Sequence, residues 1–296
     1  MFDSIRHIPV DRKNSLPISD LRKRYQATGI PVVFGDLTKN WPAIRNWNLD
    51  YLQERAGGLS AAYFDEKDRA TSNAMLKPSA MMPLTEALER LSASPRARIA
   101  QVPVSERSVI GADFTYPRLG FRFLTRLTSL HVGGEQAVGL MQQASSVMHT
   151  VRCHFGARAH ILLIPPKQTP LMYRVGKSQH TIRDINFLAP QFDEYPALKF
   201  VSGYVAELQH GDAVYIPAGY WYCVAYEGVG IQLSLHALSG SLWQYISAVW
   251  KRWLTRVTGL RLLGAAGGRR LSRRERRVQA KTNRRINAFL AKRNAK

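Results

Sequence analysis

Histidine and cysteine side chains near the middle of the chain have the chemistry to bind a metal ion or to act as a nucleophile. His149 and Cys153 are four positions apart, so a regular strand places both on one face and His154 on the other. A thiolate beside an imidazole binds zinc or attacks an electrophile. A buried cysteine and a hydrogen-bonded histidine are the commoner arrangement. We therefore treat His149, Cys153 and His236 as an alternative polar site.

Other catalytic motifs are absent from the sequence. It contains no Walker-type phosphate loop, no G-x-G-x-x-G fingerprint and no G-x-S-x-G elbow. The glycine-rich segment 264–268 lacks both the Lys-Ser/Thr pair and a preceding strand, so it does not form a phosphate loop. We expect His160 to be a satisfied core or rim histidine and His210 to lie exposed in a turn.

The elements that must position these groups are short strands, which begin at about residue 128. The apolar run 159–164 is stopped by Pro165-Pro166. Short strands with a turn signal every several residues predict a β-barrel or sandwich. The further strands, separated by glycine-containing turns, are expected at residues 204–208, 213–216, 221–226 and 230–238.

Helices are expected on both sides of this β-rich region. Residues 17–28, 46–56 and 83–91 have helical patterns, and residues 30–35 form a short strand. A final basic helix is expected at about 270–292. Between Ser241 and Gly259, the apolar residues recur at helical spacing, as Leu242, Ile246, Val249, Trp250, Trp253 and Val257.

Four stretches of the sequence occur in an order known from one protein family. The most specific is 208–221, LQHGDAVYIPAGYW, and the others are 30–52 with its W-P-A, 161–166 with its Pro-Pro, and 184–196. Together they resemble the JmjC/cupin-like hydroxylase family, which includes the asparaginyl hydroxylase acting on hypoxia-inducible factor, and the stretch at 208–221 resembles that family's L-x-P-G-D-x-L-Y-I-P-P-G-W-W run. The resemblance covers roughly residues 25–240. It implies a mainly β double-stranded β-helix of the cupin or jelly-roll type, with N-terminal helical additions and C-terminal helices.

The resemblance also implies that the usual metal ligands are missing. Family members hold Fe(II) with a His-x-Asp pair on one strand and a second His on a later strand. Tyr222 stands at the position of that later His, after Gly219-Tyr220-Trp221. The His-x-Asp pair falls near Gln143-Ala144-Ser145, and residues 132–148 contain neither His nor Asp. A neutral tyrosine is a poor Fe(II) ligand, so we expect no metal and no cofactor.

The same positions define an expected pocket lined by Gln143, Ser145 and Tyr222. Relatives often bind the 2-oxoglutarate carboxylate with a lysine near the start of the Pro-Pro strand. Arg158 lies close to that place and has the forked donors that hold a carboxylate. A surface arginine at the end of a strand is the alternative that we prefer.

Positive charge is concentrated at the C-terminal end. The net charge is +21, and residues 251–296 hold 16 Lys/Arg and one acid, Glu275. This asymmetry favours RNA or an anionic membrane surface as a partner, although a solvated tail is equally compatible. Residues 269–296 contain one aromatic residue, Phe289, which argues against stacking on single-stranded bases. The basic face of the last predicted helix consists of Arg273, Arg277, Lys281 and Arg284, opposite Leu271, Val278, Ile286 and Phe289.

Cysteine usage and hydropathy indicate the compartment. Cys153 and Cys223 form no disulfide framework, the N-terminus has no apolar signal region, and no run of 18 apolar residues occurs. We expect a cytoplasmic protein, with the basic tail able to place it at the periphery of a membrane.

Three functions therefore stay open. The first is a metal-free pseudo-oxygenase that binds a protein segment or a small molecule in its barrel. The second is an active Fe(II)/2-oxoglutarate hydroxylase with displaced ligands such as His149 and His236. The third is RNA or membrane binding through the tail. The expected organisation is a cupin-like domain at 1–240, a Trp-bearing helix at 241–263 that forms a homodimer or covers the barrel, and a linker with a basic tail at 264–296.

Overall fold

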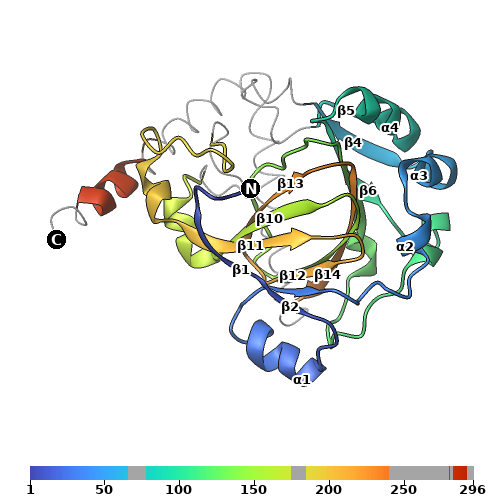
Figure 1. Cartoon of the computed structure of the whole chain (residues 1–296), viewed down its shortest axis with the longest axis horizontal. Coiled ribbons are helices and arrows are strands. Elements are labelled where there is room, and N and C mark those ends of the chain that lie inside the picture. The colour runs from blue at the N-terminus through green and yellow to red at the C-terminus, as the bar shows by residue number, and fades with distance from the viewer. Residues whose placement is uncertain (66–77, 175–184, 240–279, 281–282, 292–296) are drawn as a thin grey trace, which may run out of the picture.

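The protein, seen in a computed structural model, is described over residues 1–65, 78–174, 185–239, 280 and 283–291. Two β-sheets face each other and form a barrel, with helices along one side (Figure 1). The predicted mainly β, double-stranded architecture with N-terminal helices is confirmed. Among the described residues, no helix has the length and hydrophobicity needed to cross a membrane.

The smaller sheet has five strands, which are β1 (Arg6–Pro9), β8 (Gln142–Gln143), β10 (Ala159–Ile164), β11 (Ser202–Leu208) and β13 (Trp221–Tyr226). Their order across the sheet is β1-β11-β10-β13-β8. Strand β1 runs parallel to β11, and the other neighbours are antiparallel. Strands β10 and β13 have the bounds that the sequence predicts.

The larger sheet has nine strands, in the order β2-β3-β12-β9-β14-β7-β6-β4-β5. Strands β12 and β14 have the bounds that the sequence predicts, and β3 is three residues long within the expected 30–35. The strands are β2 (Asp11–Lys13), β3 (Val32–Phe34), β4 (Ser60–Phe64), β5 (Ala80–Pro83), β6 (Arg98–Pro103), β7 (Ser129–Gly133), β9 (Met148–Gly156), β12 (Ala213–Ile216) and β14 (Gly230–Leu238).

The three helices predicted before the barrel are present, with small differences at their ends. The second begins at Leu49 rather than at residue 46, because the Asn48 side chain accepts a hydrogen bond from the Tyr51 amide and caps that end. The helical elements are α1 (Ile18–Asp20) with its π-helical continuation η1 (Leu21–Gln26), α2 (Ala43–Asn46), α3 (Leu49–Ala56) and α4 (Leu84–Ala93), and the 3-10 turns η3 (Val109–Asp113), η4 (Thr125–Leu127), η5 (Pro166–Leu171) and η6 (Pro196–Phe200).

Three apolar clusters hold these layers together. The first contains Phe155 and packs α3 and α4 against the outer face of the larger sheet. The second contains Trp221 and packs η6 against the outer face of the smaller sheet. The third contains Ile161 and Val214 and lies between the two sheets. The barrel interior is therefore partly filled by apolar side chains.

The last described segment is a helix at residues 283–291. Ile286 is 2% exposed and belongs to the cluster with Trp221, and Leu290 packs against the same cluster. Phe289, which was predicted to share an apolar stripe with Ile286, is 43% exposed, so the buried contacts of this helix come from Ile286 and Leu290.

Candidate binding site inside the barrel

Strands β9 and β14 alternate between apolar and polar side chains. Val151 and Cys153 of β9, with Leu233 and Leu235 of β14, belong to the cluster outside the barrel. Successive side chains of a strand point to opposite faces, so the residues between them face the smaller sheet. The two strands are in register, and their inward polar pairs are Thr150 with His236, Arg152 with Ser234, and His154 with Gln232.

Arg152 is the charged residue at the centre of this row. It is 5% exposed, and its Nε donates a hydrogen bond to the Ser234 Oγ at 3.1 Å. Its guanidinium carbon lies 4.9 Å from the centroid of the Tyr222 ring on the opposite sheet, which is a cation–π contact. Within the described residues, no carboxylate forms an ion pair with Arg152. The barrel therefore encloses a positive charge without an acidic partner there.

Tyr222 also bonds across the smaller sheet. The Gln142 Nε2 donates to the Tyr222 Oη at 2.7 Å, and the two residues are register partners on β8 and β13. Gln143, which was expected to line the pocket, instead pairs with Trp221 and donates to the Gly219 carbonyl at 3.0 Å. A shift of one residue moves a side chain to the other face of a strand, so Gln142 takes the inward place predicted for Gln143.

Ser145 lies in the turn that follows β8. Its carbonyl accepts from the Gly219 amide at 2.9 Å, and its Oγ accepts from the Val147 amide at 3.3 Å. These bonds give Ser145 a role in joining the turn to the Gly219 turn. Of the three residues predicted to line the pocket, Tyr222 is the one that the structure brings against Arg152.

Two inward histidines are uncharged at neutral pH. The His236 Nδ1 lies 3.1 Å from the Thr150 Oγ1, and the His131 Nε2 lies 3.2 Å from the Ser129 Oγ. Burial lowers the pKa of His236 to about 4, and the charge of Arg152 contributes in the same direction. Burial, followed by the charges of Arg152, His236 and Arg98, also lowers the pKa of His131 well below 6.5. Arg152 thus carries a buried positive charge among uncharged imidazoles.

The Tyr226 ring lies between the sheets, close to Gly133 and Gly230. An added Cβ on Gly133 would come within 2.4 Å of the Tyr226 ring, and one on Gly230 within 2.7 Å. His154, whose ring centroid is 6.4 Å from that of Tyr226, and its register partner Gln232 are fully buried. The Gln232 amide and the His154 Nδ1 have no hydrogen-bond partner among the described residues. Buried polar atoms of this kind usually contact an ordered water or a ligand atom.

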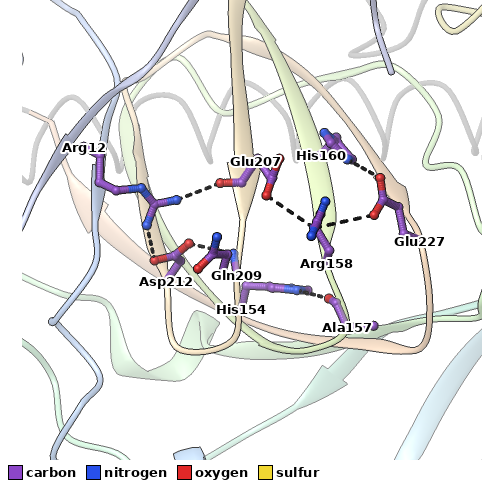
Figure 2. Close-up of polar contacts among 9 residues, drawn as sticks. All are labelled: Arg12, His154, Ala157, Arg158, His160, Glu207, Gln209, Asp212 and Glu227. Atoms are coloured by element: carbon purple, nitrogen blue, oxygen red, sulfur yellow. Dashed lines mark hydrogen bonds and ion pairs between the residues drawn. The ribbon is translucent and has the colours of Figure 1, made fainter.

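Arg158 lies outside the barrel interior. It is 54% exposed and forms ion pairs with Glu207 at 3.3 Å and Glu227 at 3.6 Å. Figure 2 shows Arg158 between these two carboxylates, with His160 bonded to Glu227 on the far side. The reason is its position before β10, whose first residue, Ala159, faces inward. The surface-arginine interpretation matches this placement, and Arg158 is not part of the pocket.

The alternative polar site is not assembled. His149 and Cys153 share a face of β9, as predicted, but that face lies outside the barrel, whereas His236 points inside. The His149 Nδ1 accepts hydrogen bonds from the Tyr215 Oη at 3.0 Å and the Ala218 amide at 3.2 Å. Cys153 is fully buried among apolar groups, which raises the pKa of its thiol far above the ordinary value. Zinc binding or nucleophilic attack by these residues has no structural support.

A divalent metal ion does not fit the residues at the expected position. Among the described residues, no group of three His, Cys, Asp or Glu could hold a metal ion. Tyr222 and Gln142 offer a neutral phenol and an amide, and the Arg152 guanidinium covers the phenol ring. Fe(II) sites of the facial type need imidazole and carboxylate ligands, and a neighbouring cation repels the metal.

Of the four basic residues predicted on the last helix, Arg284 lies in the described part of the chain. It is exposed on the helix at 283–291. Arg273, Arg277, Lys281 and the Trp-bearing segment 241–263 lie outside the described residues. Binding of RNA or an anionic membrane through the tail, homodimer formation through the C-terminal helices and a cytoplasmic location stay predictions.

Comparison with protein families gives a match over most of the chain. The family model described as a cupin-like domain matches residues 18–243. The match begins at α1 and ends just beyond β14, so it contains Gln142, Arg152, Tyr222 and Ser234. The residues of the barrel interior therefore belong to the domain itself.

Proposed function

We propose, from the premise that this chain belongs to the cupin-like domain family, that it is a metal-free binding protein whose ligand enters the barrel. The observation that carries the proposal is the contact set of Tyr222. Its hydroxyl accepts from Gln142 and its ring lies against Arg152, where the family resemblance places a metal-binding histidine. A cation and neutral groups suit an anionic or polar ligand better than a dication.

Electrostatics argue against Fe(II) at this place. A dication and a unit positive charge ~6 Å apart at an effective dielectric constant of ~20 repel each other by on the order of 5 kcal/mol. Relatives of the iron-dependent type offset the charge of the metal with a carboxylate ligand. In the described part of the interior, the nearby groups are hydroxyls, amides and neutral imidazoles. Nothing in this set compensates for the repulsion.

An active hydroxylase with displaced ligands is the competing function. The displaced ligands considered for it, His149 and His236, lie on opposite faces of the larger sheet and so do not share one metal ion. The His149 Nδ1 already accepts two hydrogen bonds, from Tyr215 and Ala218. The geometry therefore favours a binding protein.

Bound iron and turnover test the proposal. The full chain is purified without oxygen in the presence of Fe(II) and 2-oxoglutarate, and iron content and succinate release are measured. We expect neither stoichiometric iron nor succinate, and stoichiometric iron with turnover would overturn the proposal. A variant with Gln142→His and Tyr222→His serves as a control, because a cross-strand pair of imidazoles should raise the metal content above that of the wild type.

A further inference from the structure

We propose that Arg152 binds the carboxylate of a small monocarboxylate inside the barrel, an inference that rests on the proposed binding function. Arg152 is 5% exposed and lacks an ion-pair partner among the described residues. Arginine stays charged in proteins, and a buried charge is costly unless it is paired. An anionic ligand supplies the missing partner.

The hydrogen bonds of the guanidinium determine how such a ligand is held. The Nε donates to the Ser234 Oγ, and the ring of Tyr222 covers one face of the group. The Nη1 and Nη2 donors have no hydrogen bond to a described residue, and they lie on the edge that accepts a carboxylate in a two-bond, forked geometry. Ser234 and Tyr222 thus hold the guanidinium with that edge available.

The charge around Arg152 selects a monoanion. His131 and His236 are neutral at pH 7, because burial lowers the pKa of each. Arg98 also acts on His131, but its guanidinium carbon lies over the Phe64 ring of β4, 5.3 Å from the ring centroid. The Arg152 guanidinium balances one negative charge. A phosphate dianion or a dicarboxylate would leave a second charge that Arg152 does not compensate.

Acidic residues of the barrel do not compete for this place. Glu207 and Glu227 are on the outer rim, where they pair with Arg158 (Figure 2). Asp212 pairs with Arg12 of β2. These three acids already form ion pairs with Arg158 or Arg12. A carboxylate that pairs with Arg152 would therefore come from a ligand.

Ligand-induced thermal stabilisation of the full chain tests the inference. Sodium acetate, acetamide, sodium succinate and sodium phosphate are compared at matched ionic strength adjusted with sodium chloride. We expect acetate to raise the melting temperature with saturation, and acetamide, which has the same shape without charge, to have no effect. Succinate and phosphate should stabilise less than acetate. Equal effects of acetate and acetamide, or a larger effect of phosphate, would overturn the inference.

Variants connect the effect to Arg152. Arg152→Met should lower acetate affinity by about 30-fold or more, because the carboxylate loses a buried charged partner. Arg158→Met removes an exposed arginine from the rim and should leave the acetate response unchanged. Arg152→Lys keeps the charge and loses the fork, so it should bind acetate more weakly than the wild type and remains informative if the methionine variant does not fold. An acetate response that survives in both Arg152 variants would refute the site.

Failure of the inference and failure of the proposed function give different results. Stoichiometric iron with turnover overturns the metal-free function, whatever acetate does. Absence of iron together with absence of an acetate response leaves the metal-free function in place and removes the carboxylate. Absence of iron together with an acetate response that depends on Arg152 supports both.

Discussion

The Gln142 Nε2 donates to the Tyr222 Oη over 2.7 Å, so a neutral hydrogen bond joins β8 to β13. Arg152, from the larger sheet, contacts the ring of the same Tyr222 side chain. Tyr222 therefore connects three strands from two sheets. The phenol at the position where the family resemblance places a metal-binding histidine contacts the guanidinium that we propose as the ligand-binding group.

The energetic coupling between Gln142 and Tyr222 can be measured. We expect Tyr222→Phe and Gln142→Leu each to lower the free energy of unfolding, and the double variant to lose about 1 kcal/mol less than their sum. Each single change removes the same hydrogen bond. Urea denaturation of the four proteins provides the cycle. A coupling of zero would mean that the bond contributes nothing to stability.

Removal of the buried charge should not destabilise the protein. Arg152→Met replaces an unpaired guanidinium with an apolar side chain of similar length, and we expect the free energy of unfolding to be equal to or higher than that of the wild type. Arg158→Met, at an exposed ion pair, should change it by less than about 1 kcal/mol. Both values come from urea denaturation without added carboxylate. A large loss in Arg152→Met would show that the guanidinium is structural.

Stability should fall in mild acid. Burial lowers the pKa of His149, His154 and His236 to about 4, below the ordinary 6.5. The unfolded chain then binds more protons than the folded chain between these values, so the free energy of unfolding decreases as pH falls from about 6.5 toward 4. For one such histidine the full loss is on the order of 3 kcal/mol.

Denaturation midpoints at several pH values between 7.5 and 4 check this dependence. His236→Gln removes one of the titrating groups and should make the decline shallower than in the wild type. Midpoints that stay constant down to pH 4.5 would contradict the buried, neutral state of these histidines.

The strands around the Pro-Pro and Gly-Asp turns could be predicted from the sequence. Strands β10, β12, β13 and β14 are apolar runs bounded by proline or glycine, so local signals determine both ends. Strands β1 and β2 carried no such signal. They pair with β11 and β3, and the partner of β1 lies almost 200 residues away, so tertiary contacts decide their conformation.

The site was harder to predict because it depends on register. The choice between Gln142 and Gln143 is a shift of one residue, which no local pattern in that short strand fixes. Arg152 was missed, although a signal was present. Thr150, Arg152 and His154 alternate with apolar residues in a strand that is buried on both faces, and a charged residue on the inner face of such a strand indicates a site.

The close approach of Gly133 to the Tyr226 ring gives a final prediction. Gly133→Ala should destabilise the protein by about 1–3 kcal/mol, because the new Cβ would lie 2.4 Å from the Tyr226 ring and forces it to move. Gly58→Ala is the matched control, since its Cβ meets no atom within 4 Å, and it should be nearly neutral. Urea denaturation compares the two. In a Tyr226→Leu background the smaller side chain leaves room, so Gly133→Ala should cost less there than in the wild type. An equal cost in both backgrounds would show that the Tyr226 ring is not what limits the space at Gly133.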